Sequence, residues 1–466
     1  MPVPGPGYSI TVRLEAPPSA SAAGDLASAI GKVGGVITAF DVVESHTDRI
    51  VVDITANTLN DDHARDITEE LERLPGVVVR KVSDRTFLIH LGGKIEIRPK
   101  IALKNRDDLS RAYTPGVARI CQAIAENPDD ARRLTIKRNT VAVVTDGSAV
   151  LGLGNLGPAA ALPVMEGKAA LFKKFANVDA WPVCLDTQDV EEIIRTVQLI
   201  APVYGGINLE DIAAPRCFEI ERRLRQKLDI QVFHDDQHGT AIVVLAALRN
   251  ALRVVGKSLW DCRIVVCGVG AAGSAIVRLL LQRGPGDVIG VDINGIVHPD
   301  RGDLDENLAW IALNTNHERR TGTLHDALVG ADVFIGVSAP NLFGAEQVAT
   351  MAANPVVFAL ANPDPEIDPL EAQRYAAVVA TGRSDYPNQI NNVLAFPGVF
   401  RGLLDAQART VSDDMLLAAA DAIADVVDGE RLNASFIVPS VFDSAVAPAV
   451  AECVRRAAVS HVPSDR

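Results

Sequence analysis

The stretch CRIVVCGVGAAGSAIVRLLLQRG, residues 262–284, decides the fold of the second half of the chain. A β-branched run is followed by Gly268, Gly270 and Gly273 in the spacing G-x-G-x-x-G, and then by an apolar helical pattern. Glycines at these positions let a strand turn tightly into a helix, so that backbone N–H groups can approach a diphosphate at the positive helix end. The stretch predicts a Rossmann-type unit that binds a dinucleotide. The alternative is a tight turn in another sheet of similar layout.

The next strand, DVIGVD, ends in Asp292, which lies 19 residues beyond Gly273. A carboxylate at this place accepts a hydrogen bond from a ribose 2′-hydroxyl and repels a 2′-phosphate. Asn294 follows closely, and the sequence places no Arg or Lys near the end of the strand. The pattern favours NAD, and NADP stays open because a loop elsewhere could supply the missing positive charge.

The composition of the 466 residues excludes several classes of protein. A formal net charge of -14 argues against binding to nucleic acid or to an anionic membrane, since both reward an excess of Lys and Arg. No run approaches 18 apolar residues, and the first ten residues lack the pattern of a secretion signal. Six scattered cysteines without a CxxC pair indicate a reducing cytoplasm.

The order of predicted strands and helices gives an α/β fold class. We expect a Rossmann-type NAD-binding domain and an α/β substrate domain, preceded by a βαββαβ, ferredoxin-like domain. The expected boundaries are 1–92 for the first domain, 93–104 for a linker, 105–252 for the substrate domain, 253–425 for the NAD-binding domain, and 426–466 for C-terminal helices that pack back on the body.

The first domain reads as alternating strands and helices, with the segment GKVGG at the first helix–strand turn and VVVRKVSDRTFLIHL, residues 77–91, as its last strand. This order resembles an ACT domain, a regulatory module that often binds small ligands. A dimerisation module and a sensor of a small-molecule effector are equally compatible with the pattern.

Two acidic pairs stand where apolar strands give way to helices. Asp235 and Asp236 lie in QVFHDDQHGTAIVVLAAL, and Glu210 and Asp211 lie in YGGINLEDIAAP. Four carboxylates at one sheet edge repel one another unless they are protonated or bridged by a cation, and oxygen ligands suit Mg²⁺ or Mn²⁺. Each pair alone could also be a solvated helix N-terminus.

His234 and His238 flank the second acidic pair at a spacing of four residues. A zinc site of the HExxH kind is an alternative there, but that motif requires a helix interior, and these residues span an expected strand end and loop. The sequence therefore favours packing or supporting roles for both histidines.

Several longer motifs together resemble the bacterial-type malic enzymes and run in the family order from about residue 105 to residue 402. They are RAYTPGVARIC, VTDGSAVLGLGNLGPAAALPVMEGKAALFKKFA, INLEDIAAPRCFEIE, VFHDDQHGTA, ANPDPE and NQINNVLAFPGVFRG. The resemblance implies oxidative decarboxylation of malate to pyruvate and CO₂ with NAD or NADP and a divalent cation, with oxaloacetate decarboxylation as a side activity. It also implies a homodimer or a higher homo-oligomer.

The resemblance implies a role for each matching residue. The roles are proton donor for Tyr113, general base for Lys168 with Asp235 assisting it, metal ligands for Glu210, Asp211 and Asp236, and contacts to substrate or nicotinamide for Asn362 and for Asn391 or Asn392. A lysine that acts as a base must be neutral, so we expect its pKa to lie well below about 10.4. In larger members an arginine after DG holds a substrate carboxylate, whereas this chain has Ala149 there.

Two rival functions remain at this stage. One is a 2-hydroxy acid or amino acid dehydrogenase that releases no CO₂, and the other is a metabolite sensor with an inactive catalytic body. Release of CO₂ from malate separates the first rival, and measurable turnover separates the second.

Overall fold

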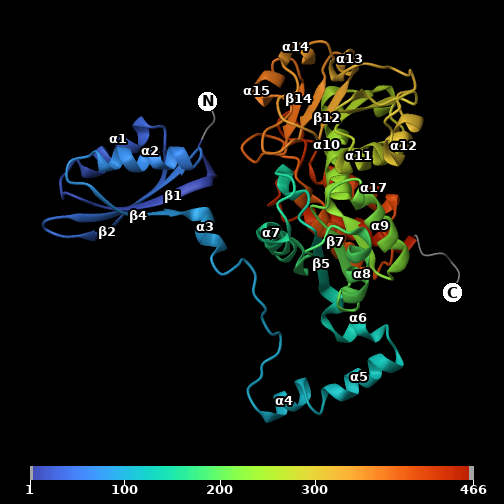
Figure 1. Cartoon of the computed structure of the whole chain (residues 1–466), viewed down its shortest axis with the longest axis horizontal. Helices are drawn as coiled ribbons and strands as arrows, with labels where there is room; N and C mark the ends of the chain where they lie inside the picture. The colour runs from blue at the N-terminus through green and yellow to red at the C-terminus, as the bar shows by residue number, and fades with distance from the viewer. Residues whose placement is uncertain (1–3, 461–466) are drawn as a thin grey trace. The chain divides into compact units, whose positions relative to one another are not determined.

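The computed structural model describes residues 4–460, and its contacts divide the chain into two units, one up to Glu96 and one from Ile97 onward. The first unit holds one antiparallel sheet in the order β2-β3-β1-β4, and α1 and α2 cover one face of it (Figure 1). Its elements are β1 (Gly5–Ala16), α1 (Ala22–Lys32), β2 (Val36–Ser45), β3 (Ile50–Thr58), α2 (Asp61–Glu72), β4 (Val78–Asp84) and α3 (Arg85–His90). The βαββαβ order predicted from the sequence is confirmed.

The prediction of a last strand that runs through residues 77–91 is wrong at its C-terminal end. The strand β4 stops at Asp84, whose side chain accepts hydrogen bonds from the backbone N–H groups of Thr86 and Phe87. This N-cap starts the short helix α3, since an aspartate in extended conformation satisfies the free N–H groups of a first turn. Residues 92–105 then carry no helix or strand.

The second unit begins with a four-stranded parallel sheet in the order β6-β5-β7-β8. Its strands are β5 (Thr140–Thr145), β6 (Asp179–Cys184), β7 (Gly206–Leu209) and β8 (Gln231–His234). The helices of this part are α4 (Arg106–Ala112), α5 (Val117–Glu126), α6 (Asp130–Leu134), α7 (Pro158–Ala176), α8 (Val190–Ile200), α9 (Arg216–Lys227) and α10 (Thr240–Val255). The parallel order brings the carboxyl ends of β7 and β8 together.

A six-stranded sheet follows in the order β11-β10-β9-β12-β13-β14, parallel except for β11, as a Rossmann-type unit requires. Its strands are β9 (Arg263–Cys267), β10 (Asp287–Asp292), β11 (Gly295–Ile296), β12 (Val333–Gly336), β13 (Val356–Ala359) and β14 (Val378–Thr381). The helices are α11 (Ala271–Leu281), α12 (Glu306–Asn314), α13 (Leu324–Leu328), α14 (Ala345–Val348), α15 (Pro369–Ala372), α16 (Phe396–Asp405), α17 (Asp413–Val426) and α18 (Val446–Ser460). The predicted α/β fold class is confirmed.

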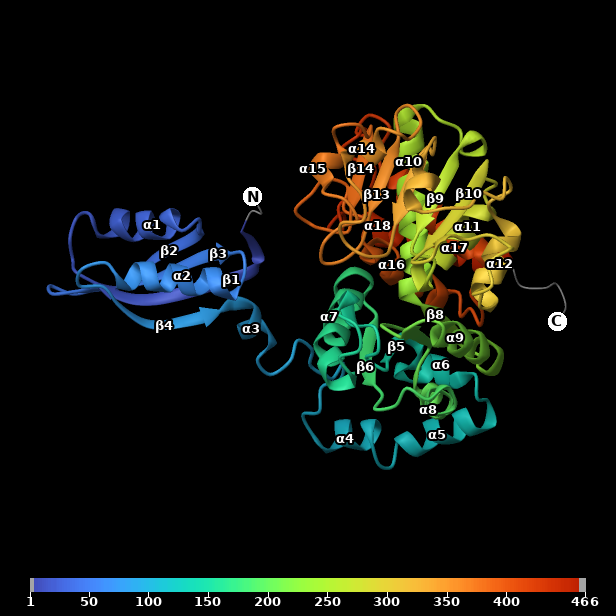
Figure 2. The ribbon, with the colours of Figure 1, turned by 45° about the horizontal axis from the view of Figure 1, so that its top comes forward.

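The helix α10 joins the two sheets of the second unit (Figure 2). It packs on α11 and α17, and one apolar core extends through it from Val141 of β5 to Ile264 of β9. Residues Asp235–Val255 are long and apolar enough to cross a membrane by length and composition, but 67% of this stretch is buried inside the protein. A helix that is apolar all round is expected at the centre of a large core.

Candidate functional site

Three carboxylates meet at the carboxyl ends of β7 and β8. Glu210 and Asp211 directly follow β7, and Asp236 stands in a π-helical turn, Asp235–Gly239, that connects β8 to α10. One oxygen from each of these three side chains lies within 4.8 Å of the others. Asp236 also accepts a hydrogen bond of 2.8 Å from the backbone N–H of Asp211, which fixes the two loops against each other.

The electrostatics of this cluster disfavour three ionised acids without a counter-charge. Burial, followed by repulsion from Asp236 and Glu210, raises the pKa of Asp211 to about 8. Burial also raises the pKa of Glu210 and of Asp236. Asp211 Oδ2 is buried without a hydrogen-bond partner in the described chain. Oxygen ligands that crowd in this way fit a divalent cation such as Mg²⁺ or Mn²⁺.

Lys168 lies beside the carboxylates on α7. Its Nζ atom is 2.8 Å from Glu210 Oε1, contacts Asp235 Oδ2, and lies 4.1 Å from the centroid of the Phe396 ring. The side chain is 7% exposed. Burial acts to lower the pKa of Lys168, but the charges of Asp235 and Glu210 outweigh burial and raise it above the ordinary value. The expectation of a lowered pKa concerns Lys168 with a divalent cation beside it, and it stays a prediction.

Asp235 is fully buried next to this lysine, and burial raises its pKa to about 8. Asn392 donates a hydrogen bond of 2.5 Å from Nδ2 to Asp235 Oδ2. The neighbouring Asn391 instead caps a short 3₁₀ turn by accepting from the backbone N–H of Val393. Of the two adjacent asparagines that the sequence left open, Asn392 is the one in contact with the buried cluster.

Glu221 on α9 is a supporting residue that the sequence analysis missed. Its buried carboxylate accepts hydrogen bonds from the backbone N–H of His234 (3.2 Å), from Gln237 Nε2 (3.3 Å) and from His238 Nε2 (2.8 Å). Burial opposes its charge, but His238 and Arg225 outweigh burial and lower the pKa of Glu221 to about 2. The carboxylate thus anchors the turn that carries Asp235 and Asp236. In the sequence, Glu221 stands only as one of several acidic residues in the helical segment CFEIE, so no pattern distinguishes it.

The hydrogen bond between His238 and Glu221 also argues against a zinc site at His234 and His238. His238 hydrogen-bonds to Glu221, and the only cluster of metal-ligating side chains found among residues 4–460 is the set Glu210, Asp211 and Asp236. His234 is buried, with its Nδ1 atom 3.7 Å from Asp236. His238 therefore supports the acidic turn, whereas both ring nitrogens of His234 are buried without a hydrogen-bond partner among the described residues. The loop expected after β8 is a π-helical turn that leads directly into α10.

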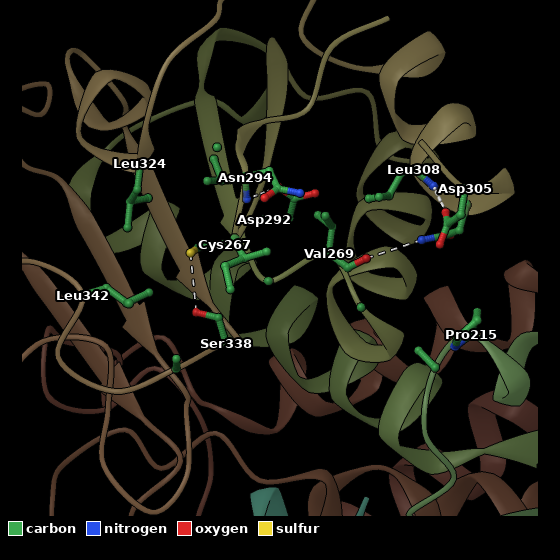
Figure 3. Close-up of a pocket in the computed structure, with 18 of the residues that line it drawn as sticks. Pro215, Cys267, Val269, Asp292, Asn294, Asp305, Leu308, Leu324, Ser338 and Leu342 are labelled. Atoms are coloured by element: carbon green, nitrogen blue, oxygen red, sulfur yellow. Dashed lines mark hydrogen bonds between the residues drawn. The ribbon is translucent and has the colours of Figure 1, made fainter. Parts of the chain in front are cut away.

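A cavity of about 740 Å³ opens at the carboxyl edge of the six-stranded sheet, and Gly268, Gly270 and Asp292 are among its lining residues (Figure 3). Gly268 has φ +93, and a Cβ atom there would lie 2.6 Å from the Val337 carbonyl. Gly273 lies behind it, where a Cβ atom would be 2.0 Å from the Gly268 carbonyl oxygen. The turn can therefore form only with glycine at these two positions, and Gly270, the N-cap of α11, faces open space.

A loop places a basic residue near the end of β10, which is the alternative that the sequence left open. Arg301, in the loop between β11 and α12, forms a two-pronged ion pair with Asp292 at 2.9 and 2.8 Å. The sequence did not identify Arg301 as this residue, because a separation of nine positions through a loop carries no local signal.

Two predicted site residues lie outside the clusters. Tyr113 follows α4 and is 67% exposed, and α4 lies apart from α7 in both views (Figures 1 and 2). Asn362 is exposed at the end of β13, where its Oδ1 atom lies near Gly382. Ala149 takes part only through its backbone, since its N–H donates to the carbonyl of Asp211 at 3.0 Å.

Comparisons with known proteins agree with these two centres. Residues 92–225 match the family "Malic enzyme, N-terminal domain", and residues 237–459 match "Malic enzyme, NAD binding domain". An NAD-dependent malic enzyme of Geobacillus stearothermophilus is 57% identical over 456 residues, which cover 97% of this chain and 95% of that protein.

Two further proteins are similar over a shorter part of the chain. A bifunctional malic/malolactic enzyme of Bacillus subtilis (strain 168) is 52% identical over 369 residues, 79% of this chain and 90% of that protein. The crystal structure of an NAD-dependent malic enzyme from Thermotoga maritima is 48% identical, with a TM-score of 0.78, and covers 80% of this chain and 99% of that chain.

Proposed function

The chain belongs to the malic enzyme family, and from this premise we propose how its own residues divide the oxidative decarboxylation of malate with NAD(P)⁺. The observation that carries the proposal is the cluster in which Lys168 contacts Glu210 and Asp235 beside three convergent carboxylates. The two rivals, a dehydrogenase that releases no CO₂ and an inactive sensor, explain neither this cluster nor the family match.

We propose Glu210, Asp211 and Asp236 as the ligands of Mg²⁺ or Mn²⁺. These residues would hold the cation, which would supply positive charge that stabilises negative charge developing on the substrate oxygens. Positive charge beside Lys168 would also favour the neutral form of this lysine. Bound NAD⁺ supplies the hydride acceptor for C2 of malate.

The chain's own residues then handle the protons. Lys168 accepts the proton of the C2 hydroxyl at Nζ, Asp235 holds that atom in place, and Asn392 in turn holds Asp235. Burial of Lys168 and Asp235 excludes water from the proton path. After CO₂ leaves, C3 of the enol needs a proton, and we propose the Tyr113 phenol as its donor.

Tyr113 reaches such a position only if the segment of residues 97–127 packs against a substrate domain, of this chain or of a second copy. Exposed apolar side chains along the segment, Ile97, Ile101, Leu103 and Leu109 among them, support such packing. We therefore propose a homodimer or higher homo-oligomer, which a mass measurement in solution by light scattering tests. The expected mass is at least twice 49.5 kDa, and a single-chain mass at enzymatically active concentrations contradicts it.

We propose NAD as the preferred dinucleotide, supported by Asp292 at the edge of the cavity and by the NAD-dependent relative. Six free cysteines support a reducing cytoplasm. A small-molecule effector at the first unit stays a proposal that rests on the βαββαβ order. Asn362 remains a proposed contact to the nicotinamide or substrate.

The test is a single assay of malate-dependent NADH and NADPH formation, with pyruvate and CO₂ measured as products. We expect NADH and pyruvate in equal amounts with Mg²⁺ or Mn²⁺ present, a smaller rate with NADP⁺, and loss of turnover with EDTA. NADH without pyruvate contradicts decarboxylation, and full turnover in EDTA contradicts the metal site. With oxaloacetate as the substrate, we expect CO₂ release as a side activity.

A further inference from the structure

The ion pair at the end of β10 points to a residue that sets the dinucleotide preference. We propose that Arg301 both holds Asp292 in position for a ribose 2′-hydroxyl and is a latent ligand for a 2′-phosphate, which Asp292 and Asp303 keep occupied. This inference rests on the proposed preference for NAD, and it names the residues that produce that preference.

Every N–H group of Arg301 is already used. Nη1 donates to Asp292 Oδ1 at 2.9 Å and to the Gly295 carbonyl at 3.4 Å, and Nη2 donates to Asp292 Oδ2 at 2.8 Å. Asp303 takes the remaining donors, Nε at 2.9 Å and Nη2 at 2.5 Å. A guanidinium offers five N–H donors, so none is free for a phosphate while both aspartates are present.

The same contacts leave Asp292 with room for one more donor. Its Oδ1 atom accepts from Arg301 and from the backbone N–H of Asn294 at 2.8 Å, whereas Oδ2 accepts only from Arg301. Each carboxylate oxygen has two acceptor positions, so Oδ2 keeps one open. Asp292 lines the dinucleotide cavity, and a ribose hydroxyl can fill that position (Figure 3).

The local charge makes the arrangement selective. Two aspartates and one arginine sum to a single negative charge, which repels the roughly two negative charges of a 2′-phosphate. The Arg301 side chain is only 8% exposed, so it cannot swing away from its partners without losing several charge-assisted hydrogen bonds. Selection against a 2′-phosphate thus comes from the ion pairs among Asp292, Arg301 and Asp303 as well as from the charge of Asp292 alone.

Replacing Asp292 should turn selection against a 2′-phosphate into binding of a 2′-phosphate. In Asp292→Ser, Asp303 still accepts hydrogen bonds from Arg301 Nε and from one Nη2 hydrogen. Two other N–H groups of Arg301, one on Nη1 and one on Nη2, then point to the place that the Asp292 carboxylate occupied. Two freed donors and one positive charge at that point suit a phosphate, which arginine binds in a two-pronged geometry. The local charge also changes from −1 to neutral.

The experiment measures binding of three probes to the metal-free, malate-free protein by calorimetry. Adenosine 2′,5′-bisphosphate and adenosine 5′-monophosphate differ only in the 2′-phosphate, and NAD⁺ is the third probe. The variants are Asp292→Ser, Arg301→Leu, the double variant and a matched control, Arg455→Leu, whose arginine makes a similar two-pronged pair with Glu452 on α18. Melting temperatures are recorded to show that each variant is folded.

We expect Asp292→Ser to bind the bisphosphate roughly ten- to a hundredfold more tightly than the wild type does, with little change for the monophosphate. The double variant should lose that gain, and Arg301→Leu alone should weaken NAD⁺ roughly tenfold without a gain for the bisphosphate. The control should match the wild type.

A gain that persists in the double variant, or no gain in a folded Asp292→Ser, overturns the role of Arg301 while leaving the enzyme assignment untouched. A wild-type protein that binds neither NAD⁺ nor the monophosphate overturns the dinucleotide cavity itself, and the proposed function with it.

Discussion

Replacing Lys168 with methionine removes a buried ammonium group from between two carboxylates and keeps the length and apolar stem of the side chain. The Nζ atom lies 2.8 Å from Glu210 and contacts Asp235, and both partners are less than a tenth exposed. Among residues 4–460, the other side-chain hydrogen bond to Asp235 comes from the amide of Asn392, which is not a base. The variant therefore has no amine that can accept the C2 hydroxyl proton in place of the lysine.

The size of the effect follows from the role. Loss of a positioned general base costs about 10²- to 10⁴-fold in kcat, which is about 3 to 5 kcal/mol of the activation barrier. The effect on KM for malate should be small, because Lys168 is assigned to proton transfer and not to a substrate carboxylate. Burial raises the pKa of Asp235 even beside Lys168, and loss of the ammonium charge raises it further, so the carboxyl group of the variant takes up a proton and the fold avoids an isolated buried charge.

The assay is steady-state formation of NADH from malate at saturating Mn²⁺, with kcat and KM resolved. Lys173→Met on the same helix is the matched control, because its ammonium group pairs with Asp179 and is 54% exposed. We expect the control to retain kcat within about twofold, since exposed ion pairs contribute little. A Lys168→Met protein with nearly normal kcat and a strongly raised KM refutes the assignment of the lysine as base.

Three further outcomes follow from the same contacts. Glu221→Gln should destabilise the protein above pH 5, because the pKa of Glu221 is about 2 in the folded state and about 4.3 in the unfolded state. The charged carboxylate therefore stabilises the wild-type fold above about pH 4.3, and this stabilisation is lost as the pH falls toward about 2. In urea unfolding, the difference in free energy of unfolding between wild type and variant should shrink below about pH 4. Equal differences at pH 7 and pH 3.5 contradict the charged role of Glu221. Asn392→Ala should lower kcat about tenfold by freeing Asp235, whereas Asn391→Ala, its matched neighbour, should change mainly the melting temperature; equal kcat losses in both contradict the distinction.

The sequence predicted those features whose signals are local. The β-branched run before Gly268 and the acidic pairs at the ends of two strands were sufficient to place the dinucleotide cavity and the carboxylate edge, because parallel strands bring their carboxyl ends together. The βαββαβ order of the first unit was readable from alternation and from Gly and Pro stops.

Features that depend on distant contacts were not predictable. Glu221 on α9 accepts from His234, 13 residues away at the end of β8, and Arg301 folds back on Asp292 through a loop, so neither contact has a periodic signature in the sequence. The helix at residues 85–90 displaced a predicted strand because the Asp84 cap outweighed the apolar pattern of TFLIHL. The raised pKa of Lys168 likewise follows from two buried partners that only the fold brings together.

The most direct test of the account is the affinity of the protein for Mn²⁺, measured by calorimetry or by the paramagnetic signal of free Mn²⁺, in the wild type and in Asp236→Asn. We predict one Mn²⁺ per wild-type chain. In the variant we predict a loss of affinity at least as large as the roughly 10- to 100-fold that an outer-shell substitution costs, with NAD⁺ binding unchanged. Wild-type affinity for Mn²⁺ in a folded Asp236→Asn protein, together with Mn²⁺-dependent NADH formation, would contradict a cation held by Glu210, Asp211 and Asp236.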